Sequence, residues 1–595
     1  MMPRRGPRTG RARAAVLALA AGALAVAACA PRPRAIAYGT DTCARCRMTA
    51  SDRRFGAEIV TRTGKSYVFD SVECMAEHLA ANGRLPVHSL WVADFARPGH
   101  FVEATKAVYL RSSRVGSPMG SGVAAFGERA AAERARGELG GEVVGWEEVR
   151  SGAARAEAGG RSERNAAANP SPSPGRNPNA DANADVGPGT GAGAEAGAER
   201  GVLVVGSGTR FGSVTAAVRA AAAGDTIVVP AGVYREPTIV VGRPVTLVGR
   251  PGAVLDGEGK RAILLVRADD VTVRGLTLRN VGVSYMEDRA AVKVDSARGC
   301  VIEGNRIEDA FFGIYLARTA GCRVARNEIR ARGKSEAASG NGIHLWYSRE
   351  AEIVENRIHG QRDGIYFEFV RASRITGNTS EDNLRYGLHF MFSDSCTYAG
   401  NAFRRNGAGV AVMYTKHVAM EGNHFEDNWG GAAFGLLMKS ISDSRIAGNT
   451  FRGNTTGVYA ESSNRLDVRE NDFVGNGWAI RLMADCEDGR FTRNNFLGNS
   501  FDVATNSRSS FSTFEGNHWD GYRGYDLDHD GLGDAPYRPV TLFSVMVEDN
   551  EAALALLRSP FVELLDAAER LLPSLTPETL VDRAPALRAI PRRRS

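Results

Sequence analysis

The most regular feature of the sequence is a repeat of apolar and polar positions in its second half. Short apolar segments such as "CVIEGN" and "SRITGN" end at an asparagine, and a second apolar segment such as "FGIYLA" or "YGLHFM" follows most of them. Most of these asparagines are 22 or 23 residues apart, with steps of 29 and 26 residues where loops can be inserted: Asn305, Asn327, Asn356, Asn378, Asn401, Asn423, Asn449, Asn471, Asn494 and Asn517. This period is typical of a stacked β-solenoid and fits a sandwich or a propeller poorly.

The repeat predicts the fold of the larger part of the chain. One coil of short strands cannot bury its apolar side alone, but coils stacked about 4.8 Å apart share a continuous core. We therefore predict a mainly β protein with a right-handed parallel β-helix, a pectin-lyase-like solenoid, over residues 201–545. Its N-terminal cap is expected in "FGSVTAAVRAAAAGDTIVVPAGVY". The asparagines and glycines at the corners are expected to adopt left-handed backbone.

The segments outside the repeat have other patterns. Residues 151–200 consist mostly of Ala, Gly, Pro, Asn and Ser with almost nothing to bury, which predicts a disordered linker. Residues 546–595 are predicted to form a helical tail that docks on or caps the solenoid. The helical spacing comes from Leu554, Leu557, Phe561, Leu564, Leu565 and Leu572. Residues 29–150 remain as a small N-terminal α+β domain.

The first 28 residues have the pattern of a secretory signal. Five arginines precede an Ala-rich apolar run that ends at Ala28, and this run is too short to span a membrane comfortably. The stretch "VAAC" resembles a bacterial lipobox, in which Cys29 becomes the lipidated N-terminus. An ordinary cleavage site before a cysteine is the alternative. The lipobox predicts a membrane-anchored lipoprotein facing an extracytoplasmic space, the periplasm.

Charge and cysteine count narrow the classes of partner. The net charge is +6, and five of these charges are the arginines of the signal segment, so the mature chain is nearly neutral. A nucleic-acid partner has no electrostatic support from such a chain. Of the eight cysteines, seven remain after Cys29. An odd number in an oxidising compartment means that at least one thiol stays free or is held by a metal.

The stretch "DTCARCRM" contains the chemistry of the N-terminal domain. It places Cys43, Cys46 and Met48 within six positions, and Cys74 is a further thiol of the same domain. Zinc typically takes two such cysteine pairs, or one pair with two histidines, and the three histidines of this domain have no paired spacing. Thiolate with thioether suits Cu(I), a soft ion that accepts a low coordination number. We therefore favour a copper site over a structural disulfide.

At this point both halves resemble known families. The N-terminal domain resembles NosL, a copper(I)-binding lipoprotein, through the lipobox at Cys29 and through "CARCRM", "YVFDSVECM", "WVADF" and "SPMGSGVAAF". The large domain resembles NosD, a periplasmic β-helix protein, through its coils, "GYDLDHDGLGDAPYRP" and its C-terminal tail. The resemblance implies a fusion of two proteins that are usually encoded separately. It also places the family's copper ligands on Cys46, Met48 and Met119, with Cys43 and Cys74 as additional thiols nearby.

The resemblance also implies a function. Such proteins deliver copper(I) for the copper–sulfur cluster of nitrous oxide reductase, together with an ABC transporter made of a permease and an ATPase. The chain is accordingly expected to be a copper chaperone and maturation factor, and not an enzyme.

Two further groups of residues on the large domain could bind metals. In the aligned coils, His344, His389, Met391 and Met413 fall on outward positions, so an exposed secondary copper face is one interpretation and packing beneath a loop or the tail is the other. Asp526, Asp528, Asp530 and Asp534 have the spacing of the first half of a calcium loop, but the closing Glu is missing. A Ca²⁺ clip and a plain polar turn are both consistent with that spacing.

Two expectations remain, one for the cysteines of the coils and one for alternative functions. Cys300, Cys322 and Cys396 share an inward column and are expected to be buried core residues rather than ligands. The runner-up function is a β-helix polysaccharide lyase or epimerase, with Asp363, Glu368 and Lys416 as candidate groups. A carbohydrate-binding surface protein or adhesin is the third reading.

Overall fold

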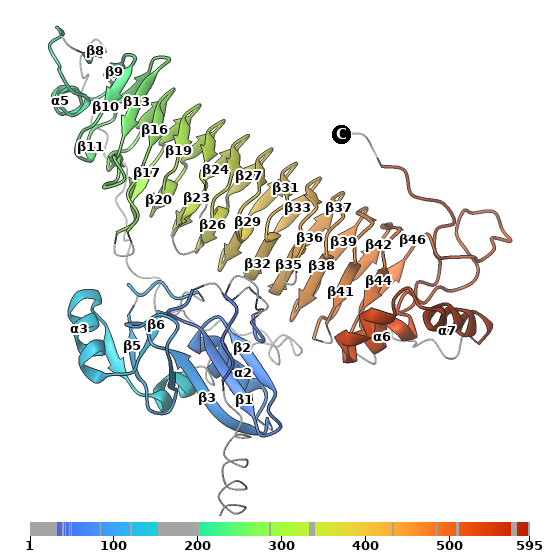
Figure 1. Cartoon of the computed structure of the whole chain (residues 1–595). Helices are drawn as coiled ribbons and strands as arrows, with labels where there is room; N and C mark the ends of the chain where they lie inside the picture. The colour runs from blue at the N-terminus through green and yellow to red at the C-terminus, as the bar shows by residue number, and fades with distance from the viewer. Residues whose placement is uncertain are drawn as a thin grey trace, which may run out of the picture. The chain divides into compact units, whose positions relative to one another are not determined.

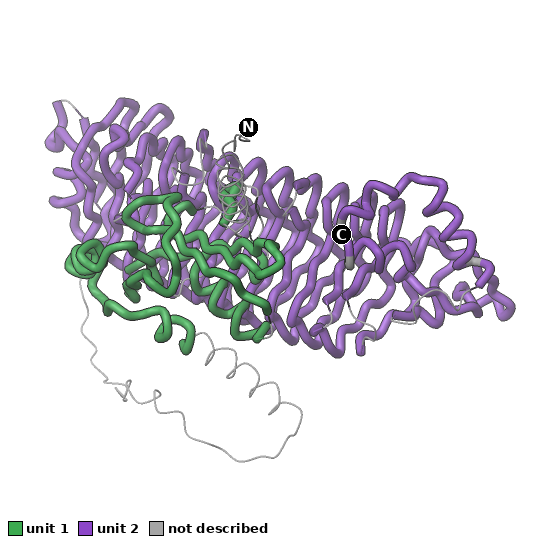
Figure 2. Tube along the Cα trace, turned by 60° about the horizontal axis from the view of Figure 1, so that its bottom comes forward, with its two compact units in different colours: residues 1–190 green, residues 191–595 purple. Residues whose placement is uncertain are grey.

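The computed structural model of the chain describes residues 33–592. Gaps in this range lie at 39–40, 42, 47, 49, 51, 84, 113, 119–121, 153–200, 207, 285–286, 333–338, 431–432, 484, 507–510 and 573–579. The chain divides into two compact units, residues 1–190 and residues 191–595 (Figure 2). The signal segment, Cys29, Met119 and nearly all of the predicted linker lie outside the described residues. None of the described helices is long and apolar enough to cross a membrane.

The first unit is an α+β fold with two small antiparallel sheets. The order in one sheet is β2-β1-β3-β4, and in the other β6-β5-β7. The elements are β1 (Ala57–Thr61), β2 (Ser66–Phe69), α2 (Val72–Ala81), β3 (Val87–Ala93), β4 (Phe101–Glu103), β5 (Val108–Arg111), β6 (Val123–Phe126), α3 (Arg129–Leu139) and β7 (Glu142–Val144). Helix α3 packs on the second sheet, where Leu110, Phe126 and Leu139 share one core. Helix α2 begins immediately after β2, and this junction positions the site described below.

The second unit is the predicted parallel β-helix (Figure 1). Three parallel sheets run along the stack of coils, and each strand pairs with the equivalent strand of the next coil. The 12-stranded sheet, called the long-strand sheet here, consists of β11 (Ile239–Val241), β14 (Leu264–Val266), β17 (Ala290–Asp295), β20 (Phe312–Ala317), β23 (Asn341–Trp346), β26 (Asp363–Glu368), β29 (Tyr386–Met391), β32 (Ala408–Lys416), β35 (Phe434–Ser442), β38 (Thr456–Glu461), β41 (Trp478–Leu482) and β44 (Phe501–Ala504).

The other two sheets have shorter strands. The 13-stranded sheet consists of β10 (Gly232–Tyr234), β13 (Ala253–Asp256), β16 (Thr277–Arg279), β19 (Arg306–Glu308), β22 (Glu328–Arg330), β25 (Arg357–His359), β28 (Thr379–Glu381), β31 (Ala402–Arg404), β34 (His424–Glu426), β37 (Thr450–Arg452), β40 (Asp472–Val474), β43 (Asn495–Leu497) and β46 (His518–Trp519). The 14-stranded sheet consists of β8 (Val202–Val204), β9 (Thr226–Val229), β12 (Thr246–Gly249), β15 (Thr272–Arg274), β18 (Val301–Glu303), β21 (Arg323–Ala325), β24 (Glu352–Val354), β27 (Arg374–Thr376), β30 (Thr397–Ala399), β33 (Ala419–Glu421), β36 (Arg445–Ala447), β39 (Asp467–Arg469), β42 (Arg490–Thr492) and β45 (Thr513–Glu515).

The repeating asparagines form a ladder in the interior. The Oδ1 atom of Asn327 accepts hydrogen bonds from the backbone and side-chain amides of Asn305, both at 3.0 Å, and the pattern continues from coil to coil to Asn517. Our expectation of left-handed backbone at these asparagines is wrong. They are buried, and the positive φ belongs to the residue before each of them, as at Gly304 and Arg326. At the corner, the backbone amide of each asparagine donates to the side-chain oxygen of the next asparagine instead of to a backbone carbonyl.

Stacked aromatic rings fill the core beside this ladder. Phe425, Phe451, Phe473, Phe496 and Trp519 stack in sequence, with ring centroids 4.0–5.0 Å apart. The coil cysteines are also buried in this core, as predicted: Cys300, Cys322 and Cys396. The N-terminal end is covered by α5 (Val214–Ala220), which packs against β9 and β11.

The C-terminal tail is only partly the helical segment that we predicted for residues 546–595. Helices α6 (Leu542–Asp549), η2 (Glu551–Leu556) and α7 (Pro560–Leu571) are present. Phe543 of α6 packs on Phe501 at the end of the long-strand sheet. Residues 580–592 are not helical. They run along the last coil, where Asp582 bridges to Phe514 and Ala586 to His518, because the open end of the solenoid offers unpaired strand edges.

Candidate metal centre

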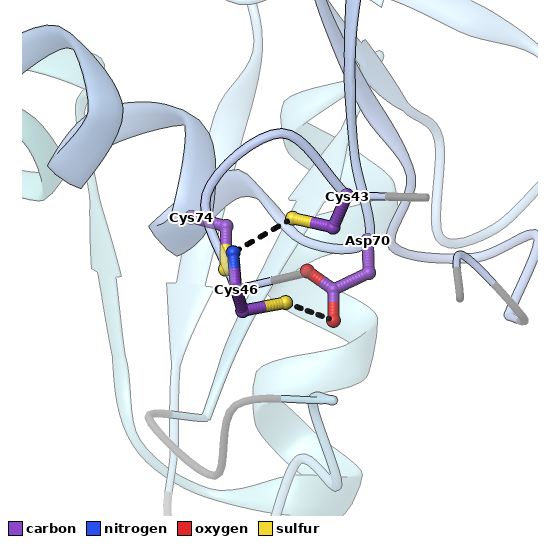
Figure 3. A group of neighbouring side chains, drawn as sticks. All are labelled: Cys43, Cys46, Asp70 and Cys74. Carbon is purple, nitrogen blue, oxygen red and sulfur yellow. Dashed lines mark hydrogen bonds between the residues drawn. The ribbon is translucent and has the colours of Figure 1, made fainter. Parts of the chain in front are cut away.

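Three cysteines and one aspartate converge inside the N-terminal unit. The ligand atoms of Cys43, Cys46, Asp70 and Cys74 all lie within 4.8 Å of one another, and all four side chains are buried (Figure 3). The Cys46 thiol donates to Oδ2 of Asp70 at 3.4 Å, and the Cys46 backbone amide donates to the Cys43 sulfur at 3.4 Å. Oδ1 of Asp70 is buried without a hydrogen-bond partner. A buried carboxylate oxygen left without a partner is costly, so it fits a site completed by a cation.

Local structure explains why these side chains meet. Cys43 and Cys46 lie on a tight loop that is closed by a hydrogen bond from the Cys43 amide to the Met48 carbonyl at 2.7 Å. Asp70 follows β2, and Cys74 lies in the first turn of α2. Ser71 caps that helix by accepting a hydrogen bond from the Cys74 amide at 3.3 Å. The end of β2, the capping residue and the first turn of α2 lie within a few residues of one another. This short connection places Asp70 and Cys74 together beside the loop of Cys43 and Cys46.

Burial and mutual hydrogen bonding set the protonation of the group. Burial raises the pKa of Cys46, Cys74 and Asp70 well above their ordinary values. Burial opposes ionisation of Cys43 as well, but hydrogen bonds from the Cys46 and Cys74 thiols outweigh it and hold the pKa of Cys43 well below its usual range. The arrangement therefore favours one thiolate that its neighbours stabilise, which suits capture of a cation.

The structure brings together part of the predicted ligand set. Cys43 and Cys74, the two additional thiols, lie in the cluster with Cys46. Met48 is buried two residues after Cys46, and Met119 lies outside the described residues. Asp70 was missed by the sequence analysis. Its only signal was its position four residues before Cys74 in "FDSVEC".

The metal argument from sequence changes with this geometry. Three thiols and a carboxylate are enough for a tetrahedral zinc site, so the number of ligands no longer excludes zinc. The choice between metals instead depends on the softness of the ligands. Three sulfur donors favour Cu(I), whereas Asp70 adds a harder oxygen.

On the β-helix, the predicted copper face has the expected register. Met391 pairs with Met413 on the next coil, and Tyr366 lies between His344 and His389 on successive coils. The residues that alternate with Met391 and Met413 belong to the buried core: Leu388, Phe390, Val410 and Val412. Because successive side chains of a strand point to opposite faces, the two methionines point away from that core.

The expectation that this face is exposed is wrong. The exposed fractions are 9% for His344, 1% for His389 and 0% for both Met391 and Met413. His344 is stacked between Tyr315 and Tyr366, and its Nδ1 atom lies 3.0 Å from the Asn341 amide nitrogen. Both ring nitrogens of His389 are buried without a hydrogen-bond partner. Burial lowers the pKa of His389 to about 3, so its imidazole is neutral and the ring nitrogen without a proton has a free lone pair for a metal.

The aspartate loop after the solenoid is partly assembled as a cation site. Carboxylate oxygens of Asp526, Asp528 and Asp530 lie within 4.8 Å of one another. Asp534 is not in that group and instead accepts a hydrogen bond from the Leu527 amide at 2.7 Å. The loop thus presents three of the four predicted oxygen donors together.

The residues suggested for a lyase or epimerase do not form a catalytic group. Asp363 and Glu368 stand at opposite ends of β26, five residues apart, so about 16 Å separates them at the rise of an extended strand. Lys416 is at the end of β32, two coils further on. The proposed acid, base and cation groups therefore have no common centre.

Comparison with known proteins agrees with both halves of the chain. Residues 326–524 match the family model described as periplasmic copper-binding protein (NosD), and residues 36–154 match the NosL model. A probable ABC transporter binding protein NosD of Pseudomonas aeruginosa is 32% identical over 370 residues, which cover 59% of this chain and 85% of that protein. The chain belongs to the NosD family. It carries a NosL domain at its N-terminus, so the predicted fusion is confirmed.

The chain is also similar to a second NosD relative and to a solved NosL structure. The probable ABC transporter binding protein NosD of Stutzerimonas stutzeri is 30% identical over 379 residues, covering 60% of this chain and 86% of the relative. The crystal structure of the copper chaperone NosL from Shewanella denitrificans aligns with 20% of this chain and 96% of its own length, with 23% identity and a TM-score of 0.19. Together, the NosL match over residues 36–154 and the NosD relative that covers 59% of the chain account for most of the described residues.

Proposed function

We propose that this NosL–NosD chain is a copper(I) chaperone that holds the ion at the cysteine cluster of its NosL domain and passes it to its own β-helix. The observation that carries the proposal is the convergence of three buried thiols and one orphaned carboxylate oxygen within 4.8 Å. Copper is the cargo of this site. The ion would be released, and the cysteine and aspartate side chains would stay in place to bind another.

The donor set supports copper over zinc. Sulfur is the majority donor, and soft thiolates select Cu(I). Thioethers would complete the site: Met48 lies two residues after Cys46 in the loop, and the resemblance to NosL adds Met119 as a ligand. The Gly122 amide donates to Ser117 Oγ at 3.0 Å, and the Val123 amide donates to Oε1 of Glu73 at 3.3 Å. Glu73 precedes Cys74, so the second contact holds the start of β6 close to the cluster.

The β-helix supplies a candidate acceptor. His389 has two nitrogens without hydrogen-bond partners, and Met391 and Met413 are in register on adjacent coils of the same sheet face. Neutral imidazole and thioether bind Cu(I) without an anionic bond, so such a site would hold the ion more weakly than the cysteine cluster. Transfer would therefore be driven by onward removal of copper rather than by a tighter acceptor.

The families support a proposal for the partners and the location. The relatives are named as ABC transporter binding proteins, which supports an association of this chain with such a transporter, its permease and its ATPase. The final acceptor would be nitrous oxide reductase, whose copper–sulfur cluster needs the delivered ion. The family description places NosD in the periplasm, and lipidation of Cys29 would anchor the chain to a membrane there. The role is binding and transfer, with no reaction catalysed by the chain.

A second metal ion, Ca²⁺, would stabilise the C-terminal end of the β-helix. Asp526, Asp528 and Asp530 present oxygen donors of the kind that Ca²⁺ prefers, on the loop that leads from the last coil to the C-terminal helices. We propose that Ca²⁺ at this loop fixes the closing end of the solenoid.

The copper assignment is tested by competition with a chromogenic Cu(I) chelator. The mature chain should bind Cu(I) in preference to Zn(II). Cys46→Ala should weaken Cu(I) binding by more than roughly a hundredfold, because removing a direct ligand costs more affinity than removing a residue that only orients a ligand. Cys396→Ala, which removes a buried thiol of the coil core, is the matched control and should bind normally. Undiminished binding by the Cys46 variant would overturn the site.

Membrane anchoring is tested separately. Cys29→Ser should release the chain from the membrane fraction, because the serine cannot accept the lipid. Continued recovery in membranes would point to another means of attachment, such as the transporter.

A further inference from the structure

A column of aromatic residues occupies a strained corner of the β-helix. Tyr347, Phe369 and Phe392 directly follow β23, β26 and β29, and Tyr414 lies at the equivalent position within β32. Their φ angles are 48°, 55°, 49° and 53° in chain order. Left-handed backbone is disfavoured for any residue with a side chain, and bulky residues adopt it rarely. Their rings stack, with centroids 4.5, 5.2 and 5.1 Å apart, which offsets part of that cost. Glycine or asparagine would fit this corner with less strain, so the rings point to a use beyond folding.

A basic groove lies along this column. It has a volume of 590 Å³, and its lining includes Tyr347, Phe369 and Phe392 together with Arg298, Arg318, Arg349 and Arg371. No acidic side chain is among the residues that line it within the described part of the chain. An apolar floor with four guanidinium groups and no carboxylate has the composition of a site for an anionic ligand.

Three of the four arginines form no ion pair within the described part of the chain. Arg318 pairs with Asp295, whereas Arg298, Arg349 and Arg371 are exposed and form no ion pair with any described residue. Bridges between neighbouring coils connect Arg298 to Ala320, Ala320 to Arg349 and Arg349 to Arg371. The backbones of these arginines therefore lie on one line along the solenoid. Their coils are separated by multiples of about 4.8 Å.

The arrangement of the rings distinguishes between two classes of anionic ligand. A sugar stacks on the face of an aromatic ring, but here the faces are covered by neighbouring rings, with interplanar angles of 23°, 11° and 11°. What the column presents is a strip of ring edges. Such a strip suits apolar side chains of a peptide, and exposed tyrosine and arginine are the residue types that dominate protein interfaces.

We propose that this groove is a docking site for an acidic, extended segment of a partner protein. Carboxylates of the segment would pair with Arg298, Arg349 and Arg371, and a guanidinium can bind a carboxylate through two parallel hydrogen bonds. Apolar side chains between those carboxylates would pack along the edges of Tyr347, Phe369 and Phe392. The proposal is independent of the copper sites, because none of these residues is a proposed ligand.

The test measures binding of a short fluorescein-labelled peptide of alternating glutamate and tyrosine to the full mature chain by anisotropy. Binding should saturate, weaken as salt is added, and be lost when glutamine replaces glutamate. Arg349→Ser with Arg371→Ser should raise the Kd about tenfold. The matched control is Arg357→Ser with Arg452→Ser, which removes two exposed arginines from the 13-stranded sheet and should leave the Kd unchanged.

Three results would overturn the proposal. Failure of the peptide to saturate would show that the groove does not recognise acidic peptides. An equal loss in the control variant would show that only the overall charge attracts the peptide. Tighter binding of an oligogalacturonate than of the peptide would make the groove a carbohydrate site instead.

Discussion

Oδ2 of Asp582 accepts hydrogen bonds from both the backbone amide and the side-chain amide of Asn517, each at 3.0 Å. In every earlier coil of the ladder, that acceptor position belongs to the asparagine of the following coil. The indole nitrogen of Trp519 donates to the same oxygen at 3.0 Å. Asp582 therefore takes the place of the missing next asparagine and closes the ladder from a segment 65 residues further along the chain.

Replacing Asp582 with alanine should destabilise the C-terminal end of the β-helix. Three buried N–H donors would lose their acceptor, and the expected loss is about 2–4 kcal/mol in the free energy of unfolding. Urea denaturation measures the loss, and hydrogen exchange should show it largest in the last coils. Asp582→Asn keeps an acceptor oxygen and is the control. A stability equal to wild type in the alanine variant would mean that water replaces the carboxylate.

Replacing Asp70 with asparagine should change metal preference more than copper affinity. The amide keeps the size of the side chain but removes the anionic oxygen, which matters more to zinc than to the softer Cu(I). Competition titrations with both ions should therefore show a larger loss for Zn(II). A parallel loss of both affinities would assign Asp70 to holding the thiols rather than to choosing the metal.

Replacing Met391 and Met413 together with leucine should stop transfer without unfolding the protein. Leucine keeps the volume and apolar character of the buried methionines, so thermal stability should change little. The change should leave copper on the cysteine cluster, as measured by the copper content of the β-helix after proteolytic separation from the NosL domain. Met420→Leu with Met438→Leu alters two methionines of the inward core instead and should transfer normally. Normal transfer by the first variant would return Met391 and Met413 to a packing role.

Calcium should raise the thermal stability of the β-helix. A ligand that binds only the folded state contributes about 2.7 kcal/mol at a concentration a hundred times its Kd. The unfolding midpoint should fall on chelation and rise again when calcium is restored. Asp528→Asn should remove this response, whereas Asp488→Asn, an exposed aspartate in a different coil, should retain it. A response that survives in the Asp528 variant would place the calcium effect elsewhere.

The periodicity of the sequence was enough to predict the β-helix, because a 22-residue apolar repeat has few folded solutions. It was not enough to predict what the asparagines do, since only stacked coils show that Asn327 receives both amides of Asn305. The copper motif led to Cys43 and Cys46 directly. Asp70 required the fold, because a turn after β2 brings it to a loop 24 residues earlier. Strand alternation likewise gives the direction of Met391 but not how deeply it is buried.

The asparagine ladder also gives the protein a unit of length. Each asparagine accepts from the coil before it and donates to the coil after it, so the ladder has a direction and tolerates no fractional coil. Extra residues must leave the stack as loops, as in the 29-residue step from Asn327 to Asn356 and the 26-residue step from Asn423 to Asn449. Descendants of such a chain can lengthen or shorten only by whole coils, so the span between the two ends of the β-helix changes in increments of about 4.8 Å.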